Sequence, residues 1–331
     1  MAKDELGTDK TSDIISTQDE EDQLKFLNET LKTSLTTARI LLEKEFQDPL
    51  WVVDGLIPEG FSILAGKPKS GKSWLSLHLA ASISYGTRFL SNFTVNRNRC
   101  LYLALEDNDR RLKKRLEAIQ AFATHELLIT TKWQRAGGTG ALANYLGGSP
   151  DIKTVIIDTL GAFMPLQDFN AYAEVYQALD NLKTLCEQRG VNIIAVHHTR
   201  KSSSTDFLDN ISGSNAFTGV ADTIIELTRG RGDADGFLRL VGRDIDDIEI
   251  ALQLVQDEGW KFLGKGSEYR MEKERRAIVE VLKEADGEMS PNEITAVVEG
   301  NSGAVRKLLS CMVNDGQIIR VRRGLYAYRE I

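Results

Sequence analysis

The sequence predicts an α/β fold built on a mostly parallel sheet, with a helical segment before it and a small domain of three helices and a hairpin after it. Two observations carry this prediction. Between Trp51 and about Gly264, short runs rich in Val, Ile and Leu alternate with helical segments, as they do when helices cover both faces of a parallel sheet. Beyond Gly264, the apolar spacing becomes that of three short helices followed by two strand-like runs.

The composition narrows the class of protein. At 331 residues, the chain is long enough for one large core and one small one. No run approaches the roughly twenty apolar residues of a membrane span, and the first residues lack the apolar core of a signal peptide, so we expect a cytoplasmic protein without membrane contact. The net charge of −7 argues against coating nucleic acid through bulk positive charge, while local basic surfaces stay open. Three widely spaced cysteines are expected to be buried free thiols, namely Cys100, Cys186 and Cys311.

The N-terminal region divides into two segments. Residues 1–22 carry eight Asp and Glu against two Lys, with almost no apolar side chains, which predicts a disordered acidic tail. Over residues 23–48, apolar residues recur at spacings of three and four, which predicts an amphipathic helix ended by Asp48-Pro49. Its apolar stripe either packs on the chain's own core or docks on a neighbouring subunit.

The first chemical motif fits the phosphate-binding pattern G-x-x-x-x-G-K-[ST]. It lies between a strand-like run at residues 61–65 and a helix-like run at residues 74–80, the setting that this motif requires; the alternative is an ordinary glycine-rich turn. In such a loop, backbone N–H groups and a helix N-terminus hold phosphates, a lysine reaches the β- and γ-phosphates, and a hydroxyl ligates Mg²⁺. We therefore predict ATP and Mg²⁺ as ligands, with Lys72 catalytic and Ser73 on the metal. The predicted nucleotide-binding residues are Gly66, Lys67, Pro68, Lys69, Ser70, Gly71, Lys72 and Ser73.

Polar residues follow three later strand-like runs, at the sheet edge where chemistry is expected. Asp158 ends the run at residues 154–157 and is predicted to orient Mg²⁺. Glu106 ends the run at residues 100–105 and is predicted to be the base or positioning group for the attacking water. The alternative for Glu106 is a cap for the following helix, a role that could also be filled by Asp107, Asn108 or Asp109.

Two histidines follow the run at residues 191–196. Adjacent residues on a strand point to opposite faces, so a shared metal ion is disfavoured for His197 and His198. We predict instead that His198 senses the γ-phosphate or positions water, with Arg200 or Lys201 close to phosphate or to a partner. Residues 201–220, rich in Ser, Asn, Asp and Gly, are predicted to form a mobile functional loop.

An arginine completes the predicted catalytic set. Arg243 follows a glycine after two strand-like runs, and a planar guanidinium offered to a neighbouring subunit's γ-phosphate would suit the transition state. Arg229 or Arg231 is the second choice, and a salt bridge from Arg243 to a nearby Asp is the alternative to both.

The C-terminal part is predicted to be a winged-helix domain over residues 268–331. Residues 264–267 read as a linker, a first helix is expected from about Glu272 to Ala285, and residues 290–293 form a capping box with Pro at the first helical position. The third helix and the final hairpin are basic, which favours DNA over the alternative of protein docking. The candidate DNA contacts in this domain are Arg306, Lys307, Arg320, Arg322 and Arg323.

Taken in order, these motifs resemble those of RecA-like P-loop ATPases, specifically the AAA-family group similar to the RepA-type hexameric replicative helicases of plasmids and phages. The resemblance covers about residues 49–255 and rests on residues 51–58 and 66–73, Leu105-Glu106-Asp107, Ile157-Asp158, and His197-His198 with Arg200-Lys201. It implies a ring, usually a hexamer, with ATP between neighbours, an arginine supplied in trans, and single-stranded DNA held in the channel by loops such as residues 201–220. The implied DNA contacts are Arg200, Lys201 and Ser203.

Three functions are compatible with this pattern. The leading hypothesis is a DNA-stimulated ring ATPase that translocates on single-stranded DNA as a replicative helicase of a mobile element. The alternative is an ATP-switched DNA-binding or loading protein that recognises a site through its winged helix without unwinding. A small-molecule kinase is disfavoured because no acceptor site or lid is visible in the sequence.

Overall fold

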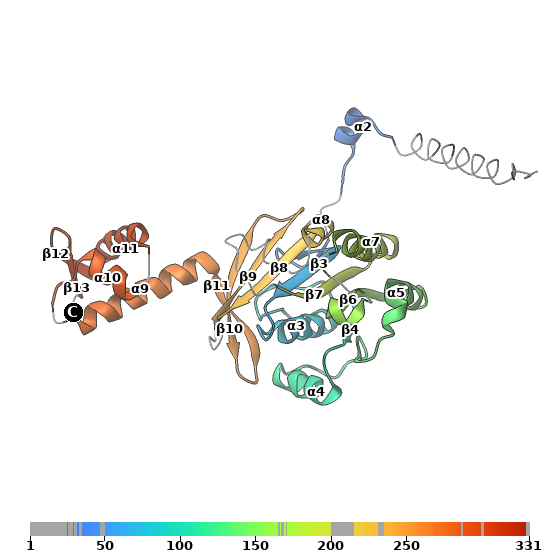
Figure 1. Ribbon diagram of the computed structural model, residues 1–331, viewed down its shortest axis with the longest axis horizontal. Helices are drawn as coiled ribbons and strands as arrows, with labels where there is room; N and C mark the ends of the chain where they lie inside the picture. Colours follow the sequence, from blue (N-terminus) through green and yellow to red (C-terminus); the bar gives the residue numbers. More distant parts are fainter. Residues whose placement is uncertain are drawn as a thin grey trace, which may run out of the picture. The chain divides into compact units, whose positions relative to one another are not determined.

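A computed structural model (Figure 1) describes most of the chain. The described residues are 25, 29, 32, 35–46, 50–164, 166, 169, 171–199, 215–230, 235–285, 287–298 and 301–328. Contacts within the chain divide it into two units, residues 1–48 and residues 49–331. The acidic tail predicted for residues 1–22 lies outside the described residues.

The first unit contains a short helix, α2 (Ala38–Glu43), where the sequence predicts one helix over residues 23–48. Residues 25, 29 and 32 are also helical, whereas residues 35–37 and 44–46 are not. The hydroxyl of Thr37 accepts a hydrogen bond from the amide of Ile40 at 3.3 Å and so caps a new helix instead of continuing an earlier one. The predicted amphipathic helix is therefore interrupted, and no residue of α2 is buried.

The second unit is built on a nine-stranded sheet in the order β11-β10-β9-β8-β3-β7-β6-β4-β5. The strands from β8 to β5 are parallel, while β9, β10 and β11 continue the sheet antiparallel. The mostly parallel sheet predicted from the sequence is confirmed. The strands are β3 (Phe61–Gly66), β4 (Arg99–Ala104), β5 (Leu127–Thr130), β6 (Ile152–Asp158), β7 (Asn192–His198), β8 (Thr223–Arg229), β9 (Asp235–Gly242), β10 (Ile248–Val255) and β11 (Gly259–Lys265).

Helices lie on both faces of this sheet and close a hydrophobic core on each (Figure 1). Successive residues of a strand point to opposite faces, so Leu64 of β3 enters the core beneath α3, whereas Ile63 and Ala65 enter the core beneath α5 and α7. The covering helices are α3 (Lys72–Tyr85), α4 (Asp109–Ala118), α5 (Gly138–Gly147), α6 (Leu160–Phe163), α7 (Tyr172–Arg189) and α8 (Ala216–Val220).

Some elements of this unit carry no clear sequence signal. The short pair β1 (Trp51–Val53) and β2 (Ile57–Pro58) forms its own two-stranded sheet, and the turn η1 (Arg135–Gly137) leads into α5. Helix α5 contains three glycines, which disfavour helix in isolation, yet Leu142 and Leu146 bury its inner face. Tertiary packing therefore overrides local propensity at α5.

The C-terminal part has a separate hydrophobic core formed by three helices and a hairpin (Figure 1). The predicted capping box is present, because Ser290 N donates to Glu293 Oε2 at 2.7 Å and Glu293 N donates to Ser290 Oγ at 3.3 Å. The elements are α9 (Gly266–Glu284), α10 (Pro291–Val298), α11 (Ser302–Asn314), β12 (Ile318–Arg322) and β13 (Leu325–Tyr328).

Helix α9 begins earlier than the sequence predicts. It starts at Gly266, so half of the expected linker is helical. Its first turns are held on the sheet by an ion pair between Arg270 Nη1 and Glu249 Oε1 at 2.7 Å and by a hydrogen bond from the Tyr269 hydroxyl to Asp235 Oδ2 at 2.6 Å. A Cβ at Gly266 would lie 2.3 Å from Glu249 Oε1, so a larger residue at this position would displace the Glu249 side chain. Among the described helices, none has the length and apolar character needed to cross a membrane.

Candidate functional site

The predicted phosphate-binding loop connects the C-terminal end of β3 to the N-terminus of α3. Gly71 has φ of 100°, and a Cβ there would lie 2.9 Å from the ring of Trp260, so both backbone and space require glycine. Lys69 is also left-handed, with φ of 65°. The amide of Thr199, which follows β7, donates to Gly66 O at 3.1 Å and ties the loop to the neighbouring strand. Such a backbone turns successive N–H groups inward and forms a concavity for anions.

Lys72 is held against this loop from inside. Its side chain is buried, and Nζ donates to Gly66 O at 2.7 Å and to Lys67 O at 3.0 Å. Burial lowers the pKa of Lys72 to about 8, although the charges of Asp158 and Glu106 act to raise it. The ammonium group therefore has partners that phosphate oxygens could replace.

The tautomer of His198 follows from its contact with Lys72. Lys72 Nζ lies 3.1 Å from His198 Nδ1, and an ammonium can only donate, so Nδ1 accepts and the ring proton lies on Nε2. Nε2 lies 3.9 Å from Glu106 Oε2. Burial, and then the charge of Lys72, lower the pKa of His198, which favours the neutral ring.

The preceding histidine points to the other face of the sheet, as strand geometry requires. The ring of His197 is stacked on Phe217 of α8, with centroids 4.3 Å apart, and also contacts Phe169. His197 thus packs against an aromatic cluster, while His198 faces the phosphate-binding loop.

Asp158 lies at the end of β6 and has one free oxygen. Its Oδ2 accepts a hydrogen bond from the Tyr102 hydroxyl at 2.8 Å, and that hydroxyl also contacts Ser76 Oγ at 3.2 Å. Burial raises the pKa of Asp158, opposed by the hydrogen bond from Tyr102. The other oxygen, Oδ1, is buried and has no hydrogen-bond partner among the described residues. A carboxylate oxygen that lines the same cleft as the Ser73 hydroxyl suits Mg²⁺, so these two residues fit the predicted metal site.

Glu106 faces this cleft from the end of β4. Thr159, which follows Asp158, donates its hydroxyl to Glu106 Oε1 at 2.7 Å, and the Glu106 side chain is about half exposed, at 52%. The alternative role as a helix cap is filled by Asn108, whose side chain accepts from the amide of Arg111 at 3.0 Å. Glu106 is therefore available to a water molecule in the cleft.

The predicted residues Lys72, Ser73, Glu106, Asp158 and His198 line a single cleft of about 340 Å³. Side chains that the sequence did not single out for this cleft complete it. They are Trp74, Arg115, Thr159 and Leu254.

Two arginines come from different sides of the cleft. Arg229 of β8 also lines it and donates to Lys69 O at 3.1 Å. Arg115 of α4 is hydrogen-bonded to Asp107, and its guanidinium lies over the Trp74 ring, 5.5 Å from the centroid. Both arginines therefore belong to the cleft of their own chain.

Arg243 lies elsewhere. It follows β9 at the sheet edge where β3 begins, opposite to the edge that carries the phosphate-binding loop. Its Nη2 donates to Gly219 O at 3.0 Å, and Nη1 lies 3.8 Å from Asp222 Oδ1, with the side chain 57% exposed. Arg243 is thus absent from the cleft of its own chain and forms the salt bridge to a nearby Asp that was the alternative.

The predicted DNA contacts divide into two groups. Arg200, Lys201 and Ser203 lie outside the described residues, as does Arg231. The candidates of the C-terminal part are exposed; Arg322 pairs with Glu288 at 3.0 Å and Arg306 donates to Asn292 at 3.0 Å. Within the part of the chain that the structure describes, no ion pair is formed by Lys307, Arg320 or Arg323.

Some of the residues that sequence reasoning missed had readable signals. Tyr102 carries a hydroxyl in the middle of an apolar run on the strand next to Asp158, which predicts a buried partner for that hydroxyl. Asp107, Arg111 and Arg115 are spaced by four residues, the spacing of ion pairs on one helix face. By contrast, nothing local to Trp260 indicates that it lies under Gly71, 189 residues away.

The chain matches the model of a known protein family. A family model described as an AAA domain matches residues 25–204, which is more than half of the chain. The matched segment includes the phosphate-binding loop and the ends of β4, β6 and β7.

Proposed function

This chain belongs to the AAA-domain family, and on that premise we propose that it is a ring-forming ATPase that moves along single-stranded DNA as a replicative helicase of a plasmid, phage or other mobile element. Membership of this family supports a P-loop ATPase. The DNA-directed activity is our proposal, and it is supported by the motifs that resemble RepA-type helicases and by the exposed basic residues of the C-terminal part.

One observation carries the hydrolytic part of the proposal. Glu106, neutral His198 and Lys72 converge on the phosphate-binding loop, and Thr159 fixes one oxygen of Glu106 at 2.7 Å. The other oxygen is left to accept a proton from an attacking water. Because His198 is neutral, its Nε2–H is the donor that faces this region.

The same cleft contains the groups that would bind the phosphates of ATP. The loop N–H groups and α3 N-terminus bind the anionic chain, and Lys72 can exchange its bonds to Gly66 O and Lys67 O for phosphate oxygens. Ser73 and Asp158 would hold Mg²⁺, which neutralises developing charge on the phosphates when bound. Tyr102 keeps the Asp158 carboxylate oriented toward the cleft.

The placement of Arg243 is compatible with a role between subunits. Because it lies at the sheet edge opposite to the loop of its own chain, it can meet a nucleotide only on another copy. Such a contact would require Arg243 to leave Gly219 O and Asp222. This supports a ring in which each cleft is completed by the next subunit, usually as a hexamer.

The basic C-terminal surface favours a second candidate. An ATP-switched protein that loads or regulates other factors would use this surface for site recognition and would not open duplex DNA. We propose that the three helices and hairpin form a winged-helix domain, and under either function its exposed arginines would contact DNA phosphates.

A strand-displacement assay separates the two candidates. Wild-type protein with ATP and Mg²⁺ should release a labelled strand from duplexes that carry a single-stranded overhang, and Glu106→Gln should not. Both 5′ and 3′ overhangs must be tested. If ATP is hydrolysed but no duplex opens with either overhang, the helicase proposal is wrong and the loading function is favoured.

A further inference from the structure

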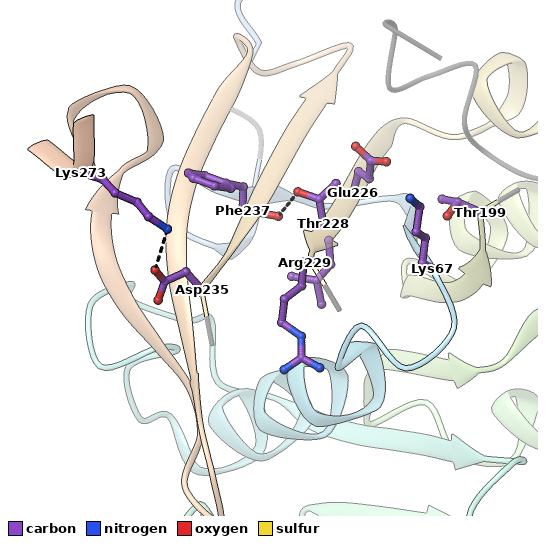
Figure 2. Close-up of a pocket in the computed structure, with 10 residues that line it drawn as sticks. Lys67, Thr199, Glu226, Thr228, Arg229, Asp235, Phe237 and Lys273 are labelled. Carbon is purple, nitrogen blue, oxygen red and sulfur yellow. Dashed lines mark hydrogen bonds and ion pairs between the residues drawn. The ribbon is translucent and has the colours of Figure 1, made fainter. Parts of the chain in front are cut away.

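A second cavity, of about 320 Å³, lies beside the phosphate-binding loop on the side of β8 and β9 (Figure 2). Figure 2 shows Lys67 and Thr199 on one side, Asp235, Phe237 and Lys273 on the other, and residues of β8 between them. The cavity shares only Arg229 with the nucleotide cleft. It is therefore a separate space that touches the loop through Lys67.

Glu226 is the unusual residue in the wall of this cavity. It lies on β8 opposite Ala65 of β3, and only 4% of it is exposed. Among the described residues, its buried Oε2 has no hydrogen-bond partner and its carboxylate forms no ion pair. Burial raises the pKa of Glu226, and the charges of Arg239 and Lys67 oppose that effect. A buried carboxylate without donors is costly, so the site is complementary to a ligand that brings N–H groups.

The rim of the cavity carries positively charged side chains. Lys67 is exposed, and no described residue forms an ion pair with it. Lys273 is 68% exposed at its side chain and lies 3.5 Å from Asp235, and Arg229 is the third cation. Three cations around one opening favour a ligand that also carries a phosphate.

Phe237 provides the apolar part of the remaining wall. The guanidinium of Arg270 lies over the Phe237 ring, 4.1 Å from the centroid. A bare phosphate would meet the carboxylate of Glu226, and a simple cation would meet the three cations of the rim. A flat ring that bears N–H donors, joined to a phosphate, satisfies the carboxylate, the apolar wall and the rim together.

We propose that this cavity binds a nucleotide unit whose base donates hydrogen bonds to Glu226 and whose phosphate contacts Lys273 on the rim. Guanine matches best, because its edge offers two adjacent N–H donors to one carboxylate. The unit comes either from a free nucleotide or from a single strand; only the second source rests on the proposed DNA function. Since Lys67 belongs to the loop and Arg229 lines both spaces, occupancy would be communicated to the nucleotide cleft.

Binding measurements on the full-length protein test this site. The phosphate-binding loop is first saturated with Mg²⁺ and a non-hydrolysable ATP analogue, and labelled guanosine monophosphate, a short d(GT) repeat and oligo-dT are then titrated by fluorescence anisotropy. Glu226→Gln should weaken binding of a guanine ligand roughly tenfold or more, since a charged hydrogen-bond acceptor is lost. Lys273→Gln should weaken binding several-fold. Glu59→Gln removes an equal charge from an exposed residue preceding β3 and should change nothing.

The outcomes are distinct. If the variants lose affinity for guanosine monophosphate alone, the ligand is a free nucleotide. If they lose affinity for the d(GT) repeat and not for oligo-dT, the ligand is a single strand. The proposal is overturned if neither guanine ligand binds, or if binding is the same in Glu226→Gln and Lys273→Gln as in wild type. If both variants bind like wild type and the protein still binds single-stranded DNA, only the cavity proposal is wrong, and the proposal of DNA translocation is unaffected. A thermal unfolding experiment checks that Glu226→Gln is folded. If it is not, the binding measured with Lys273→Gln, a change at an exposed residue, tests the proposal.

Discussion

At the scale of single residues, the charge of Lys72 should make phosphate binding by the loop depend on pH. The buried ammonium has two carbonyl partners and an imidazole, and its pKa is lowered to about 8. In the free protein, Lys72 is charged below pH 8 and loses its proton as the pH rises above that value. Phosphate binding needs the charged form, so the affinity for nucleotide should depend on this proton.

Nucleotide affinity should therefore fall above pH 8. One unit above the pKa only about a tenth of Lys72 stays protonated, so the Kd for a Mg²⁺-bound ATP analogue should rise about tenfold per pH unit. Titrations between pH 6.5 and 9.5 measure this dependence. Lys72→Ala should bind weakly at every pH without a break near 8, and an unchanged wild-type Kd across the range would contradict the assignment.

Residues of the site differ in how far the sequence could predict them. Lys72, Ser73, Glu106 and Asp158 occupy fixed positions in motifs or at strand ends, and parallel strands bring those ends together. Tyr102 and Trp260 act through pairings between distant segments, which local patterns do not encode.

At the scale of elements, the phosphate-binding loop rests on β11. Trp260 Nε1 donates to Gly71 O at 3.0 Å, and its ring fills the space that a side chain at Gly71 or Gly236 would occupy. The antiparallel strands are therefore more than an extension of the sheet, since one of them supports the turn that holds phosphates.

Trp260→Phe should loosen this support. It removes one hydrogen bond and leaves a small cavity, which together should lower the free energy of unfolding by roughly 1–3 kcal/mol and weaken nucleotide binding. Trp133→Phe is a matched control because its indole N–H has no hydrogen-bond partner. Chemical denaturation and nucleotide titration measure both effects. Equal nucleotide affinity in the two variants would contradict a role for Trp260 in holding the loop.

The element predictions were accurate where side-chain periodicity is strong and wrong where tertiary contacts decide. The buried strands β4, β6 and β7 follow from their apolar runs. Helix α9 starts six residues before the expected Glu272 because contacts with β9 and β10 order its first turns. The helix predicted over residues 23–48 is interrupted at residues 35–37, because Thr37 caps a new short helix, α2.

At the scale of the whole molecule, the chain joins a nucleotide cleft to a C-terminal part with its own core. That part carries exposed cations that form no ion pair with any described residue, notably Lys307, Arg320 and Arg323, on a chain whose net charge is −7. Local positive charge on an acidic protein indicates a specific anionic partner.

Replacing Arg320 and Arg323 by Gln should weaken duplex DNA binding and flatten its salt dependence. Each lost phosphate contact should reduce the slope of log K against log salt by about 0.9. Arg276→Gln is the matched control, because this exposed arginine is paired with Glu272 on α9. Anisotropy titrations at several salt concentrations measure the slope. If affinity and slope stay at wild-type values, the basic hairpin does not contact DNA.

The central claim, that Glu106 makes this cleft hydrolytic in a DNA-directed ATPase, is tested most directly by steady-state ATP hydrolysis with and without single-stranded DNA. Wild-type hydrolysis should rise when the strand is added. Glu106→Gln should lower kcat at least roughly a hundredfold under both conditions while it still binds the ATP analogue, and Glu117→Gln, an exposed residue of α4, should behave as wild type. Hydrolysis by Glu106→Gln at the wild-type rate, or a wild-type rate indifferent to the strand, would contradict the account.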